Sequence, residues 1–115
     1  MHSLEGIWQP VYAELDGEEA PRMVLEKLEL ELSAGTYTVR FGGETSDHGT
    51  YEIDESGMTL RGVDGPNAGR IIPALFKFAG SSLSICYGLG GTRPTRFTTG
   101  PAQQLYLVNY QRKGE

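Results

Sequence analysis

LELELSAGTYTVRF, residues 28–41, alternates apolar and polar side chains on both sides of a short turn. Three leucines spaced two apart lie on one face of a strand, whereas on a helix they would point in different directions. Ser33-Ala34-Gly35 supplies residue types that are common in turns. The stretch therefore predicts two neighbouring strands joined by a hairpin.

The same alternation predicts which side chains face the interior. Successive residues of a strand point to opposite faces, so each strand should have one buried and one solvated set. The residues expected to point inward are Leu28, Leu30, Leu32, Tyr37, Val39, Phe41, Leu83 and Ile85. The residues expected to face solvent are Glu29, Glu31, Thr38 and Arg40.

Strand-like runs separated by turn residues recur along the chain, which carries sixteen glycines and six prolines in 115 residues. The expected strands are residues 7–14, 28–32, 36–41, 44–53, 58–63, 70–78, 82–87 and 105–112. Residues 18–27 form the one expected helix, because Pro21 suits a first helical turn. The pattern predicts a single all-β antiparallel domain over residues 1–115, built as an up-and-down barrel or a two-sheet sandwich.

A count of side chains predicts how full such a barrel is. Eight strands of about eight residues direct on the order of 32 side chains inward. The chain supplies about 30 large aliphatic, methionine, phenylalanine and tryptophan side chains, some of which serve the helix and loops, and six tyrosines besides. The interior should be nearly filled, with space for a small ligand at most.

The charge distribution bears on partners. A net charge of -5 and a pI near 5.0, with dispersed basic residues, disfavour nucleic acid and anionic membrane surfaces. No apolar run is long enough for a membrane-spanning helix, so no membrane insertion is expected. The sequence as it stands begins without a basic or apolar signal segment, which favours the cytoplasm unless a leader has been trimmed.

Side chains typical of catalysis and metal binding are sparse. Cys86 is the single cysteine and is expected to be a buried packing residue. His48 follows Asp47, and such a pair could transfer protons, but Asp47-His48-Gly49 is more typical of a turn or bulge. We therefore expect no metal, no cofactor and no enzymatic activity.

Gly6-Ile7-Trp8 at the start of the first strand, together with Arg112 near the end of the last, resembles the signature of lipocalin-like barrels. The resemblance implies that Trp8 plugs one end of a barrel and that Arg112 lies across its indole ring. Such a guanidinium–aromatic contact contributes roughly 0.5–2 kcal/mol. Gly6, Trp8 and Arg112 are thus expected to be structural residues.

A longer resemblance covers nearly the whole chain. Its segments, in order, are Leu4-Glu5-Gly6-Ile7-Trp8, Asp16-Gly17, Gly49-Thr50-Tyr51, Asp64-Gly65-Pro66, Leu83-Ser84-Ile85-Cys86 and Arg93-Pro94-Thr95-Arg96-Phe97. This series is similar to the uncharacterised planctomycete-type domain family, a lipocalin-like group of bacterial proteins without an established activity. The chain departs from that pattern at Pro10 and in the glycine-rich run 88–91. The resemblance implies a lipocalin-like barrel, and with residues 18–27 as its one helix the expected fold has a short helix between the first two strands.

The last of these segments has two interpretations. In one, Arg93 binds an anion or carboxylate at the mouth of the barrel, since guanidinium groups suit planar oxyanions. In the other, Arg93 pairs with a glutamate or aspartate while Pro94 and Phe97 hold the loop over an open end. We favour the second interpretation.

These features lead to one functional prediction and one alternative. The chain is expected to be a non-catalytic binding module for a small hydrophobic or carboxylate-bearing molecule. Arg93, Tyr37, Tyr51 and Tyr87 are the candidate ligand-binding residues. The alternative is a structural or protein-interaction domain whose interior is simply packed.

Overall fold

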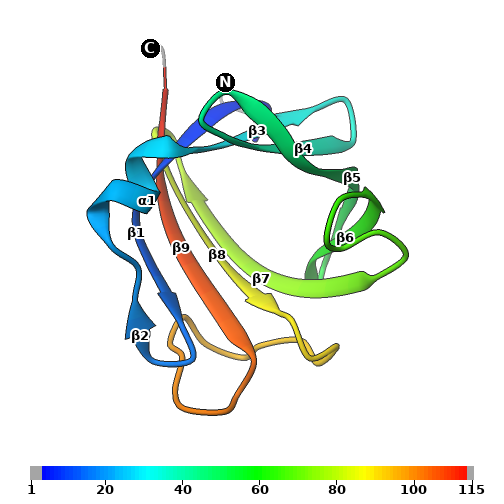
Figure 1. Cartoon of the computed structure of the whole chain (residues 1–115). Helices are drawn as coiled ribbons and strands as arrows, with labels where there is room; N and C mark the ends of the chain where they lie inside the picture. Colours follow the sequence, from blue (N-terminus) through cyan, green and yellow to red (C-terminus); the bar gives the residue numbers. More distant parts are fainter. Residues whose placement is uncertain (1–3, 114–115) are drawn as a thin grey trace.

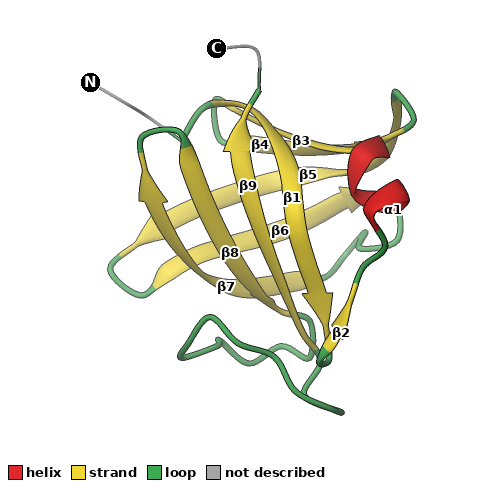
Figure 2. Ribbon diagram, turned by 90° about the vertical axis from the view of Figure 1, so that its left-hand side faces the viewer, coloured by secondary structure: helices red, strands yellow, loops and turns green. Residues whose placement is uncertain are grey.

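The computed structural model describes residues 4–113 and forms a closed barrel of antiparallel strands (Figures 1 and 2). The eight barrel strands are β1 (Gly6–Leu15), β3 (Leu28–Ser33), β4 (Thr36–Phe41), β5 (Glu44–Asp54), β6 (Gly57–Asp64), β7 (Ile71–Ala79), β8 (Ser82–Gly88) and β9 (Leu105–Arg112). A two-residue strand, β2 (Glu18–Glu19), and one helix, α1 (Arg22–Lys27), connect β1 to β3. The prediction of an all-β up-and-down barrel with one short helix is confirmed.

Closure distinguishes this barrel from a sandwich. From β3 to β9 each strand pairs with the next along the chain, and β1 pairs on one side with β3 and on the other with β9. The β1–β9 register runs from Trp8 opposite Arg112 to Leu15 opposite Tyr106. Figure 2 shows β1 and β9 side by side at the front of the barrel. The sheet therefore has no open edge between its first and last long strands.

The hairpin between β3 and β4 forms at the expected place. Ser33 pairs with Thr36, which leaves Ala34 and Gly35 as a two-residue loop. Both loop residues have positive φ, 51° and 83°. This is the backbone that the tight turns of right-twisted hairpins need, and glycine adopts it without strain.

The predicted helix is shorter than expected. Glu18 and Glu19 pair back onto the end of β1 as β2, so the helix begins only after Pro21, which is its N-cap. The turn at Asp16-Gly17 folds the chain back on β1 before a helix can start. Leu25 is the one buried residue of α1, and its carbonyl accepts a 2.7 Å hydrogen bond from the Gln9 side chain. The helix is thus fastened against β1.

The predicted faces agree with the structure for most side chains. Leu30, Leu32, Tyr37, Leu83 and Ile85 are buried in the core, and Val39 packs against it. On the outer face, Arg40 forms ion pairs with Glu29 at 2.9 Å and Glu31 at 2.5 Å.

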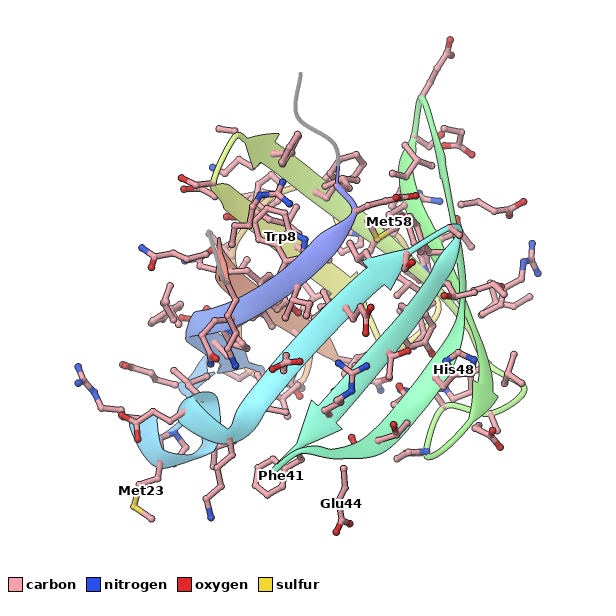
Figure 3. The ribbon with its side chains drawn as sticks, turned by 90° about the horizontal axis from the view of Figure 1, so that it is seen from above. Trp8, Met23, Phe41, Glu44, His48 and Met58 are labelled. Atoms are coloured by element: carbon pink, nitrogen blue, oxygen red, sulfur yellow. The ribbon has the colours of Figure 1, made fainter. Side chains whose placement is uncertain are left out.

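Phe41 contradicts the prediction because it is 43% exposed. It is the last residue of β4, at the end of the strand outside the core, where its ring lies 5.8 Å from the Lys27 ammonium. Figure 3 shows the ring pointing away from the barrel. Leu28, its partner in the register, is only half-buried for the same reason.

Trp8 fills one end of the barrel, as predicted. It has no solvent exposure, its indole Nε1 donates to the Leu4 carbonyl at 2.9 Å, and the Phe78 ring meets it edge-on. The Arg112 guanidinium lies 4.3 Å from the centroid of the Trp8 ring. At Gly6, φ is +138°, and a Cβ atom would stand 2.7 Å from Arg112 Nη1, so a side chain there would displace the arginine.

Replacing the plug should destabilise the fold strongly. Trp8→Ala should lower the free energy of unfolding by about 3–5 kcal/mol, because it removes a large buried aromatic and leaves a cavity. Trp8→Phe, the control, keeps an aromatic ring and should lower the free energy of unfolding by clearly less. Guanidinium-induced unfolding of the three proteins measures this, and an unchanged midpoint for Trp8→Ala would contradict the plug.

Candidate functional site

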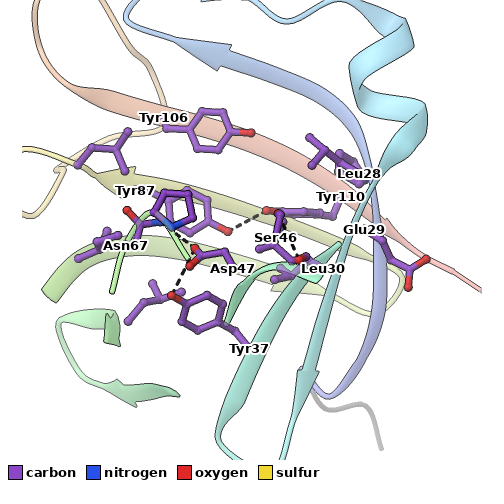
Figure 4. A pocket seen from close by; sticks show the side chains of 16 residues that line it. Leu28, Glu29, Leu30, Tyr37, Ser46, Asp47, Asn67, Tyr87, Tyr106 and Tyr110 are labelled. Atoms are coloured by element: carbon purple, nitrogen blue, oxygen red, sulfur yellow. Dashed lines mark hydrogen bonds between the residues drawn. The ribbon is translucent and has the colours of Figure 1, made fainter. Parts of the chain in front are cut away.

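A cavity of about 260 Å³ occupies the barrel interior at the end where β3 begins and β4 finishes (Figure 4). Most of its lining is apolar, from the inward faces of β3, β4, β6, β7, β8 and β9. Ser46 and Pro66 also line the cavity and are themselves exposed, so it opens to solvent beside them. Trp8 is not part of the lining. One end of the barrel is therefore plugged and the other is hollow.

Four tyrosines supply the aromatic part of the lining: Tyr37, Tyr87, Tyr106 and Tyr110. The Tyr87 and Tyr110 hydroxyls are hydrogen-bonded at 2.8 Å, and the Tyr87 and Tyr106 rings stack with centroids 5.6 Å apart. Burial raises the pKa values of Tyr87 and Tyr110 well above that of a free tyrosine. All four rings therefore present neutral hydroxyls near pH 7.

Asp47 is the one charged residue that is buried within residues 4–113. It pairs in register with Val39, whose side chain packs on the core, so its carboxylate also turns inward. The carboxylate accepts hydrogen bonds from the Asn67 side chain at 2.8 Å, the His48 backbone at 3.1 Å and the Tyr37 hydroxyl at 3.5 Å. Burial and the nearby Asp47 charge raise the pKa of Tyr37 to about 12.

The loop after β6 closes over this carboxylate through Gly65. There φ is +91°, and a Cβ atom would stand 2.9 Å from the Asp47 Cα and 3.1 Å from its Oδ1. Only glycine allows so close an approach in this backbone conformation. The approach brings the Asn67 side-chain amide within hydrogen-bond distance of the Asp47 carboxylate.

Glu29 borders the cavity, but its carboxylate points away from the other lining residues toward the outer face of the barrel (Figure 4). Arg40 and Lys113 each lie 2.9 Å from its carboxylate. The hydrogen bond from Lys113 is the largest cause that lowers the pKa of Glu29. No lysine, arginine or histidine belongs to the described lining of the cavity. Asp47 therefore has no cationic neighbour in the lining.

The structure brings together only some of the predicted ligand-binding residues. Tyr37 and Tyr87 line the cavity, whereas Tyr51 does not. Tyr51 packs on the core elsewhere, and its pKa is raised by burial and by the charge of Glu5, which lies two residues before Ile7 at the plugged end.

Arg93 lies on the outer side of the barrel wall and not at its mouth. Nη1 donates to the Met58 carbonyl at 3.0 Å and the Ala74 carbonyl at 2.6 Å, and Nη2 donates to the Thr59 hydroxyl at 3.1 Å. Thr59 faces outward, since its neighbours Met58 and Leu60 are both in the core. Arg93 thus joins β6 to β7 from outside.

Both interpretations of this segment therefore need correction. Within residues 4–113, no carboxylate lies within ion-pair distance of Arg93. Pro94 is buried, and Phe97 lies under the Lys77 ammonium, 4.7 Å from its ring centroid. Lys77 is an exposed residue of β7, so Phe97 packs on the outer wall and does not cover an open end. A hollow of about 710 Å³ borders this loop, but the Arg93 nitrogens are already bonded to the wall.

The remaining sequence candidates are separated from the cavity. His48 pairs with Thr38 on the outer face, where its Nδ1 is 3.2 Å from the threonine hydroxyl, so His48 and Asp47 do not form a proton-transfer pair. Cys86 is buried, as expected, and burial raises the pKa of its thiol. No group of three or more metal-ligating side chains occurs in the described part of the chain.

Sequence reasoning missed Asp47, Asn67, Tyr106 and Tyr110 as site residues. The tyrosines had a detectable signal, because positions 106, 108 and 110 alternate as an inward-facing set should. Asp47 had none, because the residues around it on β5 are polar on both faces. Comparisons with protein-family models, curated proteins and solved structures found no match to this chain. Residues 4–113 contain no helix of the length and apolarity needed to cross a membrane.

Buried tyrosines should make the folded protein sensitive to alkaline pH. Since the Tyr37 pKa is about 12 in the fold and 10.0 in the unfolded chain, unfolding releases protons above pH 10. The free energy of unfolding should therefore fall as the pH rises from 10 toward 12. Tyrosinate absorbance should appear together with loss of the β circular dichroism. Ionisation of all six tyrosines near pH 10 in a folded chain would contradict these assignments.

Removing Arg93 should weaken the wall. Arg93→Ala leaves two backbone carbonyls and one hydroxyl without their donor, so unfolding should become easier by about 1–3 kcal/mol. Arg96→Ala is the matched control, because Arg96 is an exposed arginine of the same loop. Thermal melting of both variants tests this, and equal midpoints for Arg93→Ala and Arg96→Ala would contradict the structural role.

Proposed function

We propose that this chain is a non-catalytic, lipocalin-like binding module that holds a small, partly apolar molecule in its cavity. The observation that carries the proposal is a hollow of about 260 Å³ inside a barrel whose other end is plugged by Trp8. Ligand sites combine a mostly apolar lining with a few oriented polar groups. This cavity has that composition, with tyrosine hydroxyls, the Asp47 carboxylate and the Asn67 amide among apolar side chains.

The volume limits the size of the ligand. At about 30 Å³ for each molecule of liquid water, the cavity corresponds to roughly nine waters. A single substituted aromatic ring or a short branched chain is of this size. Large fused-ring ligands exceed this volume.

Binding is proposed over catalysis because the polar groups of the lining are bonded to one another. Asp47 is bonded to Asn67 and Tyr37, and Tyr87 is bonded to Tyr110. Among residues 4–113, the lining contains no Ser–His or Cys–His pair of the kind that activates a nucleophile. Such groups are suited to orienting a bound ligand. The alternative, a fully packed interior, would leave no cavity of comparable volume.

A thermal-shift screen with small aromatic, aliphatic, amine and carboxylate compounds tests the proposal. A ligand at about 100 times its Kd should stabilise the fold by about 2.7 kcal/mol, because it binds the native state alone. Val39→Phe places extra carbon in the cavity and should abolish the shift, whereas Thr38→Phe on the outer face should retain it.

Two results would contradict the proposed function. One is a screen without any stabilising compound. The other is a shift that survives Val39→Phe unchanged, because that shift would come from a site outside the cavity.

A further inference from the structure

The charged Asp47 carboxylate in the cavity restricts the chemical class of ligand among those that are small enough to fit. Asp47 is 9% exposed and lies, in the view of Figure 4, between the rings of Tyr37 and Tyr87. Its three hydrogen-bond donors are an amide, a backbone N–H and a phenol, all of them neutral. The carboxylate is therefore buried among neutral donors, and the described lining holds no cation to offset its desolvation.

The carboxylate also keeps room for another donor. Ionised carboxylates offer about four lone-pair positions. Oδ1 accepts from the His48 backbone, and Oδ2 accepts from Asn67 and, at 3.5 Å, from the Tyr37 hydroxyl. That last distance is at the limit of a hydrogen bond, so a stronger donor in the cavity would compete with it.

The walls around Asp47 suit a positive charge as well. Ammonium groups are attracted to the faces of aromatic rings, and four tyrosines line the cavity. Their hydroxyl oxygens can accept N–H bonds. A carboxylate ligand would be repelled by Asp47, and the described lining holds no cation to offset that repulsion.

We propose, on the basis of the proposed function, that the cavity binds a small primary amine with an apolar body, its ammonium group held by Asp47 and its body enclosed by the tyrosines. The positive charge of the ligand satisfies the carboxylate, and the net charge of -5 favours its approach. This ligand class replaces the carboxylate-bearing molecule that was expected on the basis of Arg93, because Arg93 lies outside the cavity.

Three probes of nearly equal size test the proposal by isothermal titration calorimetry at pH 7. They are 2-phenylethylamine, 2-phenylethanol and phenylacetate, which carry a positive, no and a negative charge. The amine should bind at least about tenfold more tightly than the alcohol, because only the amine pairs with a buried charge. The carboxylate should bind most weakly. In NMR spectra of the unmodified chain, the amine should shift the Asn67 side-chain amide signals, which requires no variant.

Two variants locate the selectivity. Asp47→Asn keeps the shape of the side chain and should bring the amine and the alcohol to similar affinities. Glu44→Gln removes the same charge from an exposed position on the same strand and should leave the preference for the amine intact.

The outcomes separate this inference from the proposed function. Binding of the alcohol or the carboxylate as tightly as the amine overturns the inference alone, as does an amine preference that survives Asp47→Asn. Absence of binding by all three probes overturns the inference, and the proposed function falls with it only if the thermal-shift screen also finds no stabilising compound.

Discussion

Pairing of β1 with β9 is the constraint on which the other features depend. It closes the sheet into a barrel, so every long strand has one face toward the interior and one toward solvent. The pairing also leaves no unpaired edge on β1 or β9 where they meet. The register also places Trp8 directly opposite Arg112, which sets the arginine across the indole. An irregularity between Pro10 and Tyr12 then shifts the inward-facing positions, so that Ala13 follows Trp8 and Pro10 into the interior.

The two ends of the barrel differ because their side chains differ in shape and polarity. At the plugged end, the Trp8 side chain has no solvent exposure and packs against Phe78. At the other end, rigid tyrosines project from β4, β8 and β9 and meet by hydrogen bonds and ring stacking, which cannot fill space as flexible aliphatic side chains do. The cavity is the space between these rings that no side chain fills. Asp47, near the start of β5, is part of its lining.

Much of the fold could be predicted from local pattern. The alternation in residues 28–41 predicts two strands and their faces, and Ala34-Gly35 forms the expected turn. The prediction was wrong where a long-range contact competed with a local preference. Glu18 and Glu19 joined β1 as a strand although they precede a helix, and Phe41 lies at the end of β4 outside the core, although alternation alone would bury it.

The amino-acid sequence is enough for the strand order and the small size of the interior, because period-two alternation, turn residues and side-chain volume are local or additive properties. The Trp8 plug was expected from the resemblance to lipocalin-like barrels. Which polar groups share the interior depends on contacts between distant strands and loops. Asp47 and Asn67 are twenty residues apart and meet only when β5 and the loop after β6 close on one another through Gly65. Arg93 was placed on the outer wall in the same way, because its partners are backbone carbonyls, which every residue carries and no sequence pattern marks.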